Sequence, residues 1–190
     1  NAFDDAMDAE LFAILGELVA GSAPQRLLWA FAPSQRSLNA VAQGEAHVAG
    51  THLIDIATGA SDLGPARAAL AHTGGLIVAF ASWAQGLMVA RGNPRRLRTL
   101  ADLAQPGVRF VNREPGSGSR TVLDTLLHRA GIPASALTGY RSLVASHLDG
   151  ARVVASGNAD AAIGLEISAV ACGLDFVPLV TVRCDLVLPQ

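Results

Sequence analysis

A strand, a glycine-serine loop and a helix follow one another between residues 108 and 130, and this order constrains the fold more than any other part of the chain. Val108–Asn112 is an apolar run typical of a buried strand, the loop at 113–120 is polar, and the helix at 119–130 has one apolar face. Further strands are predicted at 26–32, 47–53, 76–80, 86–89, 161–165 and 176–188. The alternation of strands and helices predicts an α/β fold with mainly parallel strands.

The other helices follow from periodicity and from capping residues. Residues 4–20 are typical of an amphipathic helix, with an apolar stripe made of Leu11, Ile14, Leu15 and Leu18. Shorter helices are predicted from Ser34 to the residue before Gly44, at 66–71, at 98–104, at 146–156 and at 168–172. Each of them precedes or follows a predicted strand, as an α/β chain requires.

The chain contains no lysine, and all 14 of its basic residues are arginine. A Walker-type phosphate loop, a Schiff-base enzyme and a protein kinase are therefore excluded, because each needs a lysine. Any anion must instead be held by hydroxyl groups, backbone amides or the forked guanidinium of arginine.

Charge and hydropathy exclude further classes. The net charge is −2 and the arginines are scattered, so no direct contact with nucleic acid is predicted. The sequence has no apolar run of 18 residues and no signal peptide, which predicts a cytoplasmic protein without a membrane contact. Two cysteines without CxxC spacing predict no metal site. The acidic start after Asn1-Ala2 suggests that the chain is a fragment of a longer protein.

The glycine-serine loop is the strongest candidate for a binding site. Glycines at a helix N-terminus leave backbone N–H groups free to approach an anion, which the helix dipole also favours. Serine hydroxyls add donors, and arginine adds charge and paired hydrogen bonds. The predicted ligand-binding residues here are Asn112, Arg113, Gly116, Ser117, Gly118, Ser119 and Arg120. The alternative is that the loop only caps a helix.

Three other junctions carry hydroxyl or imidazole groups at strand ends or helix starts. They contribute Ser34 and Gln35, Thr51 and His52, and Ser146 and His147 to the predicted binding site. Each pair also suits a structural role, because serine is a common N-cap and a single histidine is often structural.

Enzyme motifs are scarce. The sequence has no HExxH, GxSxG or GxGxxG pattern, so we predict a protein that is not an enzyme, with no catalytic residue and no cofactor. A serine hydrolase or transferase that uses Ser117 or Ser119 stays an alternative, with His147 as base and Asp124 or Asp160 as acid.

Several motifs together resemble the periplasmic-binding-protein-like domains related to molybdate-binding proteins. They are Phe110–Arg113, Gly116–Arg120, Ala130-Gly131-Ile132, Gly139-Tyr140, Ser146-His147, Ala155–Ala161, Gly173–Leu179 and Gly50–Asp55. The resemblance implies a type 2 periplasmic-binding-protein-like fold, in which two α/β lobes with mainly parallel sheets are joined by crossing strands. The crossings would be 75–90 and 175–188. Lobe 1 would comprise 1–80 and 178–190, lobe 2 would comprise 81–177, and the ligand would lie between them.

The same resemblance implies a function. Domains of this family are ligand sensors for molybdate, tungstate or a related oxyanion, fused to a helix-turn-helix or to a molybdopterin-biosynthesis domain. The family's usual first strand is not recognisable in residues 1–5. Two further alternatives stay open: a molybdopterin-related organic anion in a cleft lined by Trp83, Tyr140 or Phe31, and a purely structural partner domain. A homodimer is a further expected partner state for either kind of domain.

Overall fold

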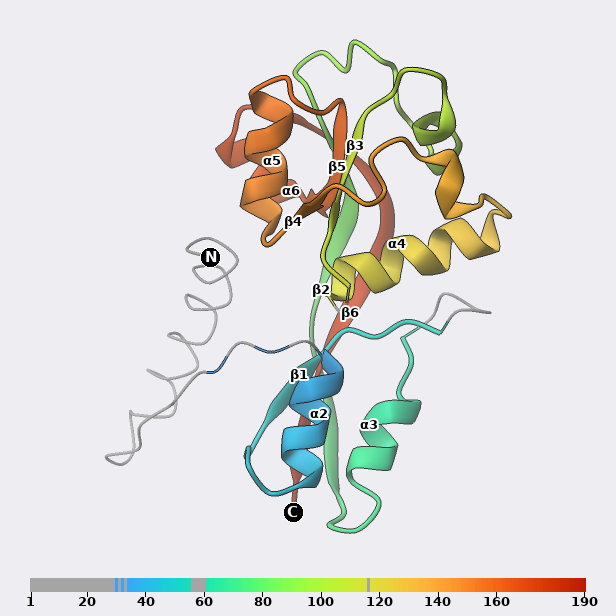
Figure 1. Cartoon of the computed structure of the whole chain (residues 1–190). Helices are drawn as coiled ribbons and strands as arrows, with labels where there is room; N and C mark the ends of the chain where they lie inside the picture. Colours follow the sequence, from blue (N-terminus) through green and yellow to red (C-terminus); the bar gives the residue numbers. More distant parts are fainter. Residues whose placement is uncertain (1–29, 31, 33, 56–60, 116) are drawn as a thin grey trace.

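Two long strands, β2 (Gly75–Val89) and β6 (Asp175–Pro189), run antiparallel beside each other through the length of the molecule (Figure 1). The computed structural model describes residues 30, 32, 34–55, 61–115 and 117–190. Within these residues the strands form one sheet in the order β1-β6-β2-β5-β3-β4. The β2–β6 pair thus lies inside the sheet, with β1 on one side and β5, β3 and β4 on the other.

The four shorter strands flank this pair. They are β1 (Ala49–Thr51), β3 (Phe110–Arg113), β4 (Leu143–Val144) and β5 (Ala161–Leu165). Strand β3 pairs in parallel with β4 and β5, whereas β5 pairs antiparallel with β2, and β1 pairs antiparallel with β6. The sheet is therefore mixed, because both crossing strands run against their neighbours.

The helices divide between two lobes. Lobe 1 holds β1, α2 (Ser34–Ala42) and α3 (Gly64–Ala69). Lobe 2 holds β3 to β5 with α4 (Gly118–Arg129), α5 (His147–Ala155), α6 (Glu166–Ala171) and the short 3-10 helices η1 (Leu100–Ala104) and η2 (Ala134–Ala136). Figure 1 shows β2 and β6 passing from one lobe into the other. The boundary residues proposed from the sequence stay a prediction.

Each face of the lobe 2 sheet is packed, because successive strand residues point to opposite faces. Leu87 and Phe110 pack with Leu123 of α4 on one face, while Met88 packs with Ala151 of α5 on the other. Because Leu123 of α4 and Ala151 of α5 are buried against the sheet, the two helices are held in fixed positions on its faces. The N-termini of α4 and α5 consequently lie near the carboxyl ends of β3 and β5.

The lobes also touch each other directly. Ile54, which follows β1 in lobe 1, is buried against Val122 of α4 and Val182 of β6, and the half-buried Trp83 packs on the same cluster. Apolar side chains from both lobes therefore share one small core beside the crossing strands.

Most predicted elements agree with this fold. The predicted strand at 161–165 has the bounds of β5, and the predicted helices correspond to α2, α3, η1, α4, α5 and α6 with small shifts at their ends. Residues 176–188, for which one or two strands were predicted, belong to the single strand β6. The type 2 α/β fold is confirmed. The sheet is mixed instead of mainly parallel, because only β5, β3 and β4 pair in parallel, whereas the crossing strands pair antiparallel with each other and with β1 and β5.

Two predicted features need correction. The expected pair of strands at 76–80 and 86–89 is one continuous strand, since β6 pairs along the whole of β2 and the irregular positions are absorbed as register shifts near Ala79 and Gln85. Of the strand predicted at 26–32, the structure describes only Ala30 and Ala32, and both are exposed and outside any strand. The other residues of that strand, and the helix predicted at 4–20, lie outside the described part.

The register shift at Gly86 generates a stability prediction. A side chain there would overlap the Val177 carbonyl and approach Phe176 and Pro178, so we expect Gly86→Ala to lower the free energy of unfolding by about 1–3 kcal/mol. Gly50→Ala in β1 is the control, because that position has open space. Urea denaturation measures both, and equal effects of the two substitutions would contradict the close packing of the crossing strands.

Candidate functional site

Groups from both lobes meet at the first turn of α4. The His52 imidazole, which follows β1 in lobe 1, lies against Gly118 so closely that a methyl group on Gly118 would overlap it. In the same turn, Ser119 is 3% exposed and its Oγ lies 3.4 Å from His147 Nε2. The charge of Arg113 acts on both imidazoles. We call His52, Arg113, Gly118, Ser119 and His147 the interlobe cluster.

Capping residues hold the two helix starts in place. Ser117 Oγ accepts a hydrogen bond from Arg120 N (3.3 Å) and donates to the Glu114 carbonyl (3.0 Å). Ser146 Oγ accepts from Asp149 N (3.0 Å) and donates to the Asp149 carboxylate (2.7 Å). Both predicted ligand hydroxyls are therefore engaged as N-caps, and they position Ser119 and His147.

Arg113 enters the cluster as part of an ion pair. Its guanidinium donates to both carboxylate oxygens of Glu114 (3.2 and 3.1 Å) and to the Ala145 carbonyl (2.8 Å), and the residue is 8% exposed. Asn112 supports this loop, accepting from Arg113 N and donating to the Tyr140 carbonyl. The sequence analysis missed Glu114, although it directly follows Arg113.

Arg120 is engaged by groups of the protein itself, and one of its bonds reaches the interlobe cluster, because its Nη1 donates to the Arg113 carbonyl (3.2 Å). Its Nε donates to the Asp124 carboxylate (2.9 and 3.0 Å), and its guanidinium lies 4.1 Å from the centre of the Tyr140 ring. Tyr140 completes the arrangement by donating from its hydroxyl to Asp124 (2.6 Å). The role of Arg120 as a ligand contact stays a prediction, and the structure shows its guanidinium held by Asp124, Tyr140 and the Arg113 carbonyl.

Lobe 1 contributes two buried hydroxyls beside His52. Ser34 Oγ, at the start of α2, accepts from His52 N (3.4 Å). Thr51 Oγ1 is buried and has no hydrogen-bond partner among the described residues. Gln35, in contrast, is exposed and donates to Asn39 on the surface of α2. The predicted Gly116 lies outside the described residues.

Both imidazoles of the cluster are held in the neutral form. Burial, together with the positive charge of Arg113, lowers the pKa of His52. The same two causes, with a contribution from His52, lower the pKa of His147 to about 3. A neutral imidazole has one donor and one acceptor nitrogen, so at neutral pH the cluster offers dipoles together with a paired arginine.

The serine-hydrolase alternative finds two of its three groups, the serine and the histidine, in place, but not the acid. Ser119 and His147 are within reach of each other, but Asp124 binds Arg120 and Tyr140, and Asp160 binds Arg109. A histidine with a pKa of about 3 is also a weak base, because a general base works best with a pKa near the operating pH. The geometry consequently favours binding over nucleophilic catalysis.

Trp83 is an aromatic neighbour of the cluster. Its ring centre lies 5.8 Å from that of His52, with the two planes tilted by 59°. Because Trp83 is on β2, this contact joins the crossing strand to the junction of the lobes. Trp83 was predicted to line the cleft, whereas Tyr140 lies on the flank of α4 and Phe31 is outside the described residues.

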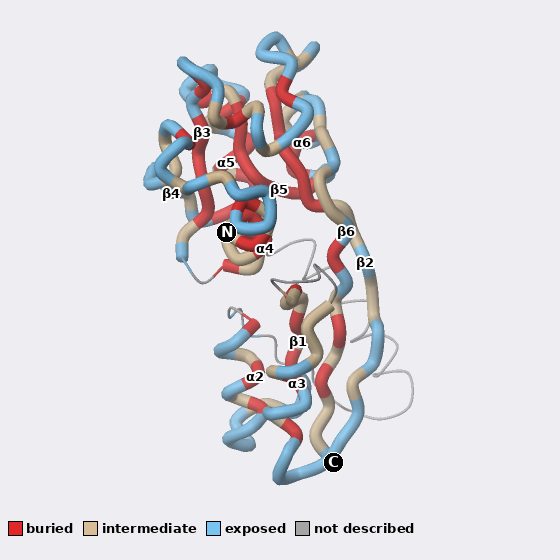
Figure 2. Tube along the Cα trace, turned by 90° about the vertical axis from the view of Figure 1, so that its right-hand side faces the viewer, coloured by how far each residue is buried: buried red, intermediate tan, exposed pale blue. Residues whose placement is uncertain are grey.

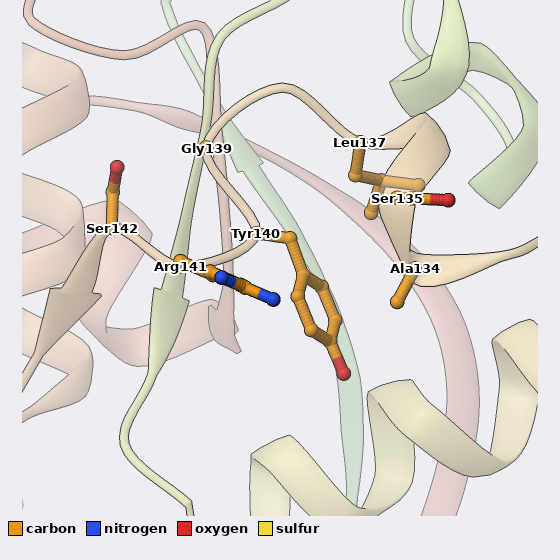
Figure 3. A pocket seen from close by; sticks show the side chains of 7 residues that line it. All are labelled: Ala134, Ser135, Leu137, Gly139, Tyr140, Arg141 and Ser142. Atoms are coloured by element: carbon orange, nitrogen blue, oxygen red, sulfur yellow. The ribbon is translucent and has the colours of Figure 1, made fainter.

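A hollow lies on lobe 2, and no residue of the interlobe cluster lines it. Its volume is about 500 Å³, and it is lined by Ala134, Ser135, Leu137, Gly139, Tyr140, Arg141 and Ser142 (Figure 3). The Tyr140 side chain points from this loop toward α4, in keeping with its bond to Asp124. None of the predicted site residues lines this pocket.

The described residues contain neither a candidate metal centre nor a candidate membrane span. Among these residues, no group of three His, Cys, Asp or Glu side chains is close enough to hold a metal ion. No helix in the same part of the chain is both long and apolar enough to cross a membrane.

Comparison with known proteins agrees with the fold. The model of the PBP superfamily domain matches residues 16–190. The chain belongs to the PBP superfamily. The uncharacterized protein YvgK of Bacillus subtilis is similar to this PBP domain, with 33% identity over 155 residues, which is 82% of this chain and 50% of that protein. The chain thus spans about half the length of the curated relative it matches.

Solved structures share the fold of this PBP domain. The CcmR regulatory domain of Synechocystis, in complex with 2-PG, has a TM-score of 0.68 at 13% identity, over 94% of this chain and 81% of that one. An ABC-type phosphate transport receptor from Vibrio cholerae has a TM-score of 0.61 at 13% identity, over 97% and 84%. These likenesses confirm the type 2 periplasmic-binding-protein-like fold.

The contact between His52 and Gly118 predicts a coupled effect. Gly118→Ala places a methyl group against the imidazole, so we expect lower stability than the wild type. His52→Ala should relieve this overlap, giving a coupling energy of about 0.5–3 kcal/mol in a double-mutant cycle. Thermal or urea denaturation of the four proteins measures it. Additive effects would show that the two residues are not in contact in solution.

The buried His147 predicts how stability depends on pH. Between pH 6.5 and about 3, the unfolded chain binds a proton at residue 147 that the folded protein does not bind. The free energy of unfolding should therefore rise with pH across this window and decrease as the pH falls. Denaturation at several pH values should give a smaller slope for His147→Gln than for the wild type, and equal slopes would contradict a buried, neutral His147.

Proposed function

We propose that this PBP domain binds a small oxyanion between its lobes, at the interlobe cluster, and that molybdate and tungstate are the first candidates. The observation that carries the proposal is the meeting of His52 from lobe 1 with the first turn of α4 from lobe 2, beside Ser119, Arg113 and His147. In a type 2 fold, a group that contacts both lobes is suited to report their closure.

The chemistry of the cluster supports an anionic ligand. The N-terminus of the twelve-residue helix α4 presents backbone N–H groups and the positive end of a helix dipole. Ser119 adds a hydroxyl, and the neutral imidazoles can each donate one hydrogen bond. Since Glu114 pairs with Arg113, these dipoles would provide most of the stabilisation of the anion.

Binding would act through the two lobes. An anion that contacts His52 and Ser119 at the same time would favour the arrangement in which the lobes are closed, and it would shift their equilibrium toward that state. We propose that a larger regulator uses this shift, with a helix-turn-helix or a molybdopterin-biosynthesis domain as the fused partner. The cytoplasmic location and the homodimer stay predictions.

A molybdopterin-related organic anion is the second candidate ligand. The observation in its favour is Trp83, whose ring lies beside His52 and could stack on a heterocycle. Under this alternative, the anionic group of the ligand would still contact α4, and its ring system would lie along β2.

Calorimetric titration tests the proposal. We expect molybdate or tungstate to bind in preference to sulfate and phosphate. We expect Ser119→Ala to weaken binding by about tenfold, equivalent to about 1.4 kcal/mol. Ser156→Ala is the control, because Ser156 is exposed at the end of α5 and its hydroxyl bonds only the nearby Val153 carbonyl and the Asn158 side chain. If none of the four anions binds, the oxyanion proposal is wrong. Tight binding of a pterin phosphate alone would favour the second candidate.

A further inference from the structure

The hollow on lobe 2 contains a cationic side chain that the rest of the described protein does not use. Arg141 lines this hollow and is exposed, and within the described part of the chain its guanidinium has neither a hydrogen-bond acceptor nor a carboxylate partner. Arg113 and Arg120, in contrast, are both paired with carboxylates. Figure 3 shows the Arg141 side chain extending toward Tyr140. A guanidinium in this position can bind an anion through two parallel hydrogen bonds.

The Tyr140 ring is an aromatic surface that the protein holds in one position. Its hydroxyl donates to Asp124 (2.6 Å), and the Arg120 guanidinium lies 4.1 Å from the ring centre. The Tyr140 carbonyl accepts a hydrogen bond from Asn112 Nδ2 (3.1 Å), which fixes the backbone as well. A ring that is already ordered can pack against an aromatic ligand with little loss of conformational entropy.

The remaining lining of the hollow defines the class of ligand. Its volume of about 500 Å³ is typical of pockets that bind small organic molecules. Ala134 and the buried Leu137 add apolar surface, Ser135 and Ser142 add hydroxyls, and no acidic residue lines the hollow. One arginine beside one aromatic ring matches a ligand with a single negative charge and a ring, as in an aromatic carboxylate.

We propose that the hollow on lobe 2 is a second ligand site, which binds a small aromatic carboxylate and stabilises the segment that carries Arg113. The carboxylate of the ligand contacts Arg141, and its ring lies beside Tyr140. The site is separate from the interlobe cluster, because no residue of that cluster lines it. The proposal therefore does not depend on which ligand binds between the lobes.

The backbone beside the hollow is bonded directly to β3. The Ser142 carbonyl accepts from Asn112 N (2.8 Å), the Tyr140 carbonyl accepts from Asn112 Nδ2, and the Ala145 carbonyl accepts from Arg113 Nη2 (2.8 Å). Figure 2 shows β3 as a buried strand of lobe 2, and Arg113 is its last residue. A ligand that orders residues 139–142 thus also orders the end of β3, which belongs to the interlobe cluster.

Side chains provide a second connection from the hollow to the same residue. Tyr140 binds Asp124, Asp124 accepts from Arg120 Nε (2.9 and 3.0 Å), and Arg120 Nη1 donates to the Arg113 carbonyl (3.2 Å). Both connections begin at Tyr140 and end at Arg113. Binding in the hollow and order at the interlobe cluster are consequently coupled, and this coupling is reciprocal.

Calorimetric titration with benzoate tests the site itself. Benzamide has the same ring without the charge, and acetate has the charge without the ring, so we expect benzoate to bind at least about tenfold more tightly than either. Arg141→Gln and Tyr140→Leu should each weaken benzoate binding at least about tenfold. Arg91→Gln is the matched control, because Arg91 is an exposed arginine of lobe 2 that does not line the hollow.

Hydrogen exchange of the same protein tests the coupling. Saturating benzoate should slow exchange of the Arg113 amide and of the first amides of α4 at least about threefold, and it should leave α2 in lobe 1 unchanged. Tyr140→Phe keeps the ring but removes the bond to Asp124. This variant should bind benzoate within about threefold of the wild-type affinity while giving less protection at Arg113, a separation that a purely structural Tyr140 would not produce.

Four results would overturn the proposal. One is no binding of benzoate, and another is equal affinity for benzoate, benzamide and acetate. A third is benzoate binding that Ser119→Ala abolishes and Arg141→Gln leaves intact, because it would place benzoate at the interlobe cluster. The fourth is binding at Arg141 that does not change exchange at Arg113, which would contradict the coupling.

Discussion

The antiparallel pairing of β2 with β6 is the interaction on which the rest of the structure depends. Both strands cross from lobe 1 to lobe 2, so β1 attaches to β6 in one lobe while β5 attaches to β2 in the other. Register shifts near Ala79 and Gln85 interrupt the ladder without ending it. Because the same two strands run through both lobes, they hold His52 of lobe 1 against the first turn of α4 in lobe 2.

The site that results depends on dipoles more than on net charge. Glu114 pairs with Arg113, and burial keeps His52 and His147 neutral, so the charge near the first turn of α4 is largely balanced within the protein. This arrangement avoids the large unfavourable free energy of burying an unpaired charge inside a protein. A site built from neutral donors can still hold an anion, provided that the donors are fixed in position beforehand.

The sequence predicted local features well and tertiary ones poorly. The loop that leads into α4 and the serine before α5 are short-range signals, and the structure places Ser119 and His147 together as neighbouring helix starts would require. The direction of Arg120 and the engagement of Ser117 by Glu114 depend on partners that no local pattern specifies. The continuity of β2 likewise depends on β6, which is about a hundred residues away in sequence, and the crossing of the lobes was predicted only through the family resemblance.

Anomalous diffraction from crystals grown with tungstate would test the central claim most directly, because it locates the bound metal oxyanion without assuming its contacts. Our account predicts one strong peak between the lobes, within hydrogen-bond distance of Ser119 Oγ and the first amides of α4, with His52 moved to admit the anion. A strong peak elsewhere on the protein, or no ordered peak at a saturating concentration, would contradict it.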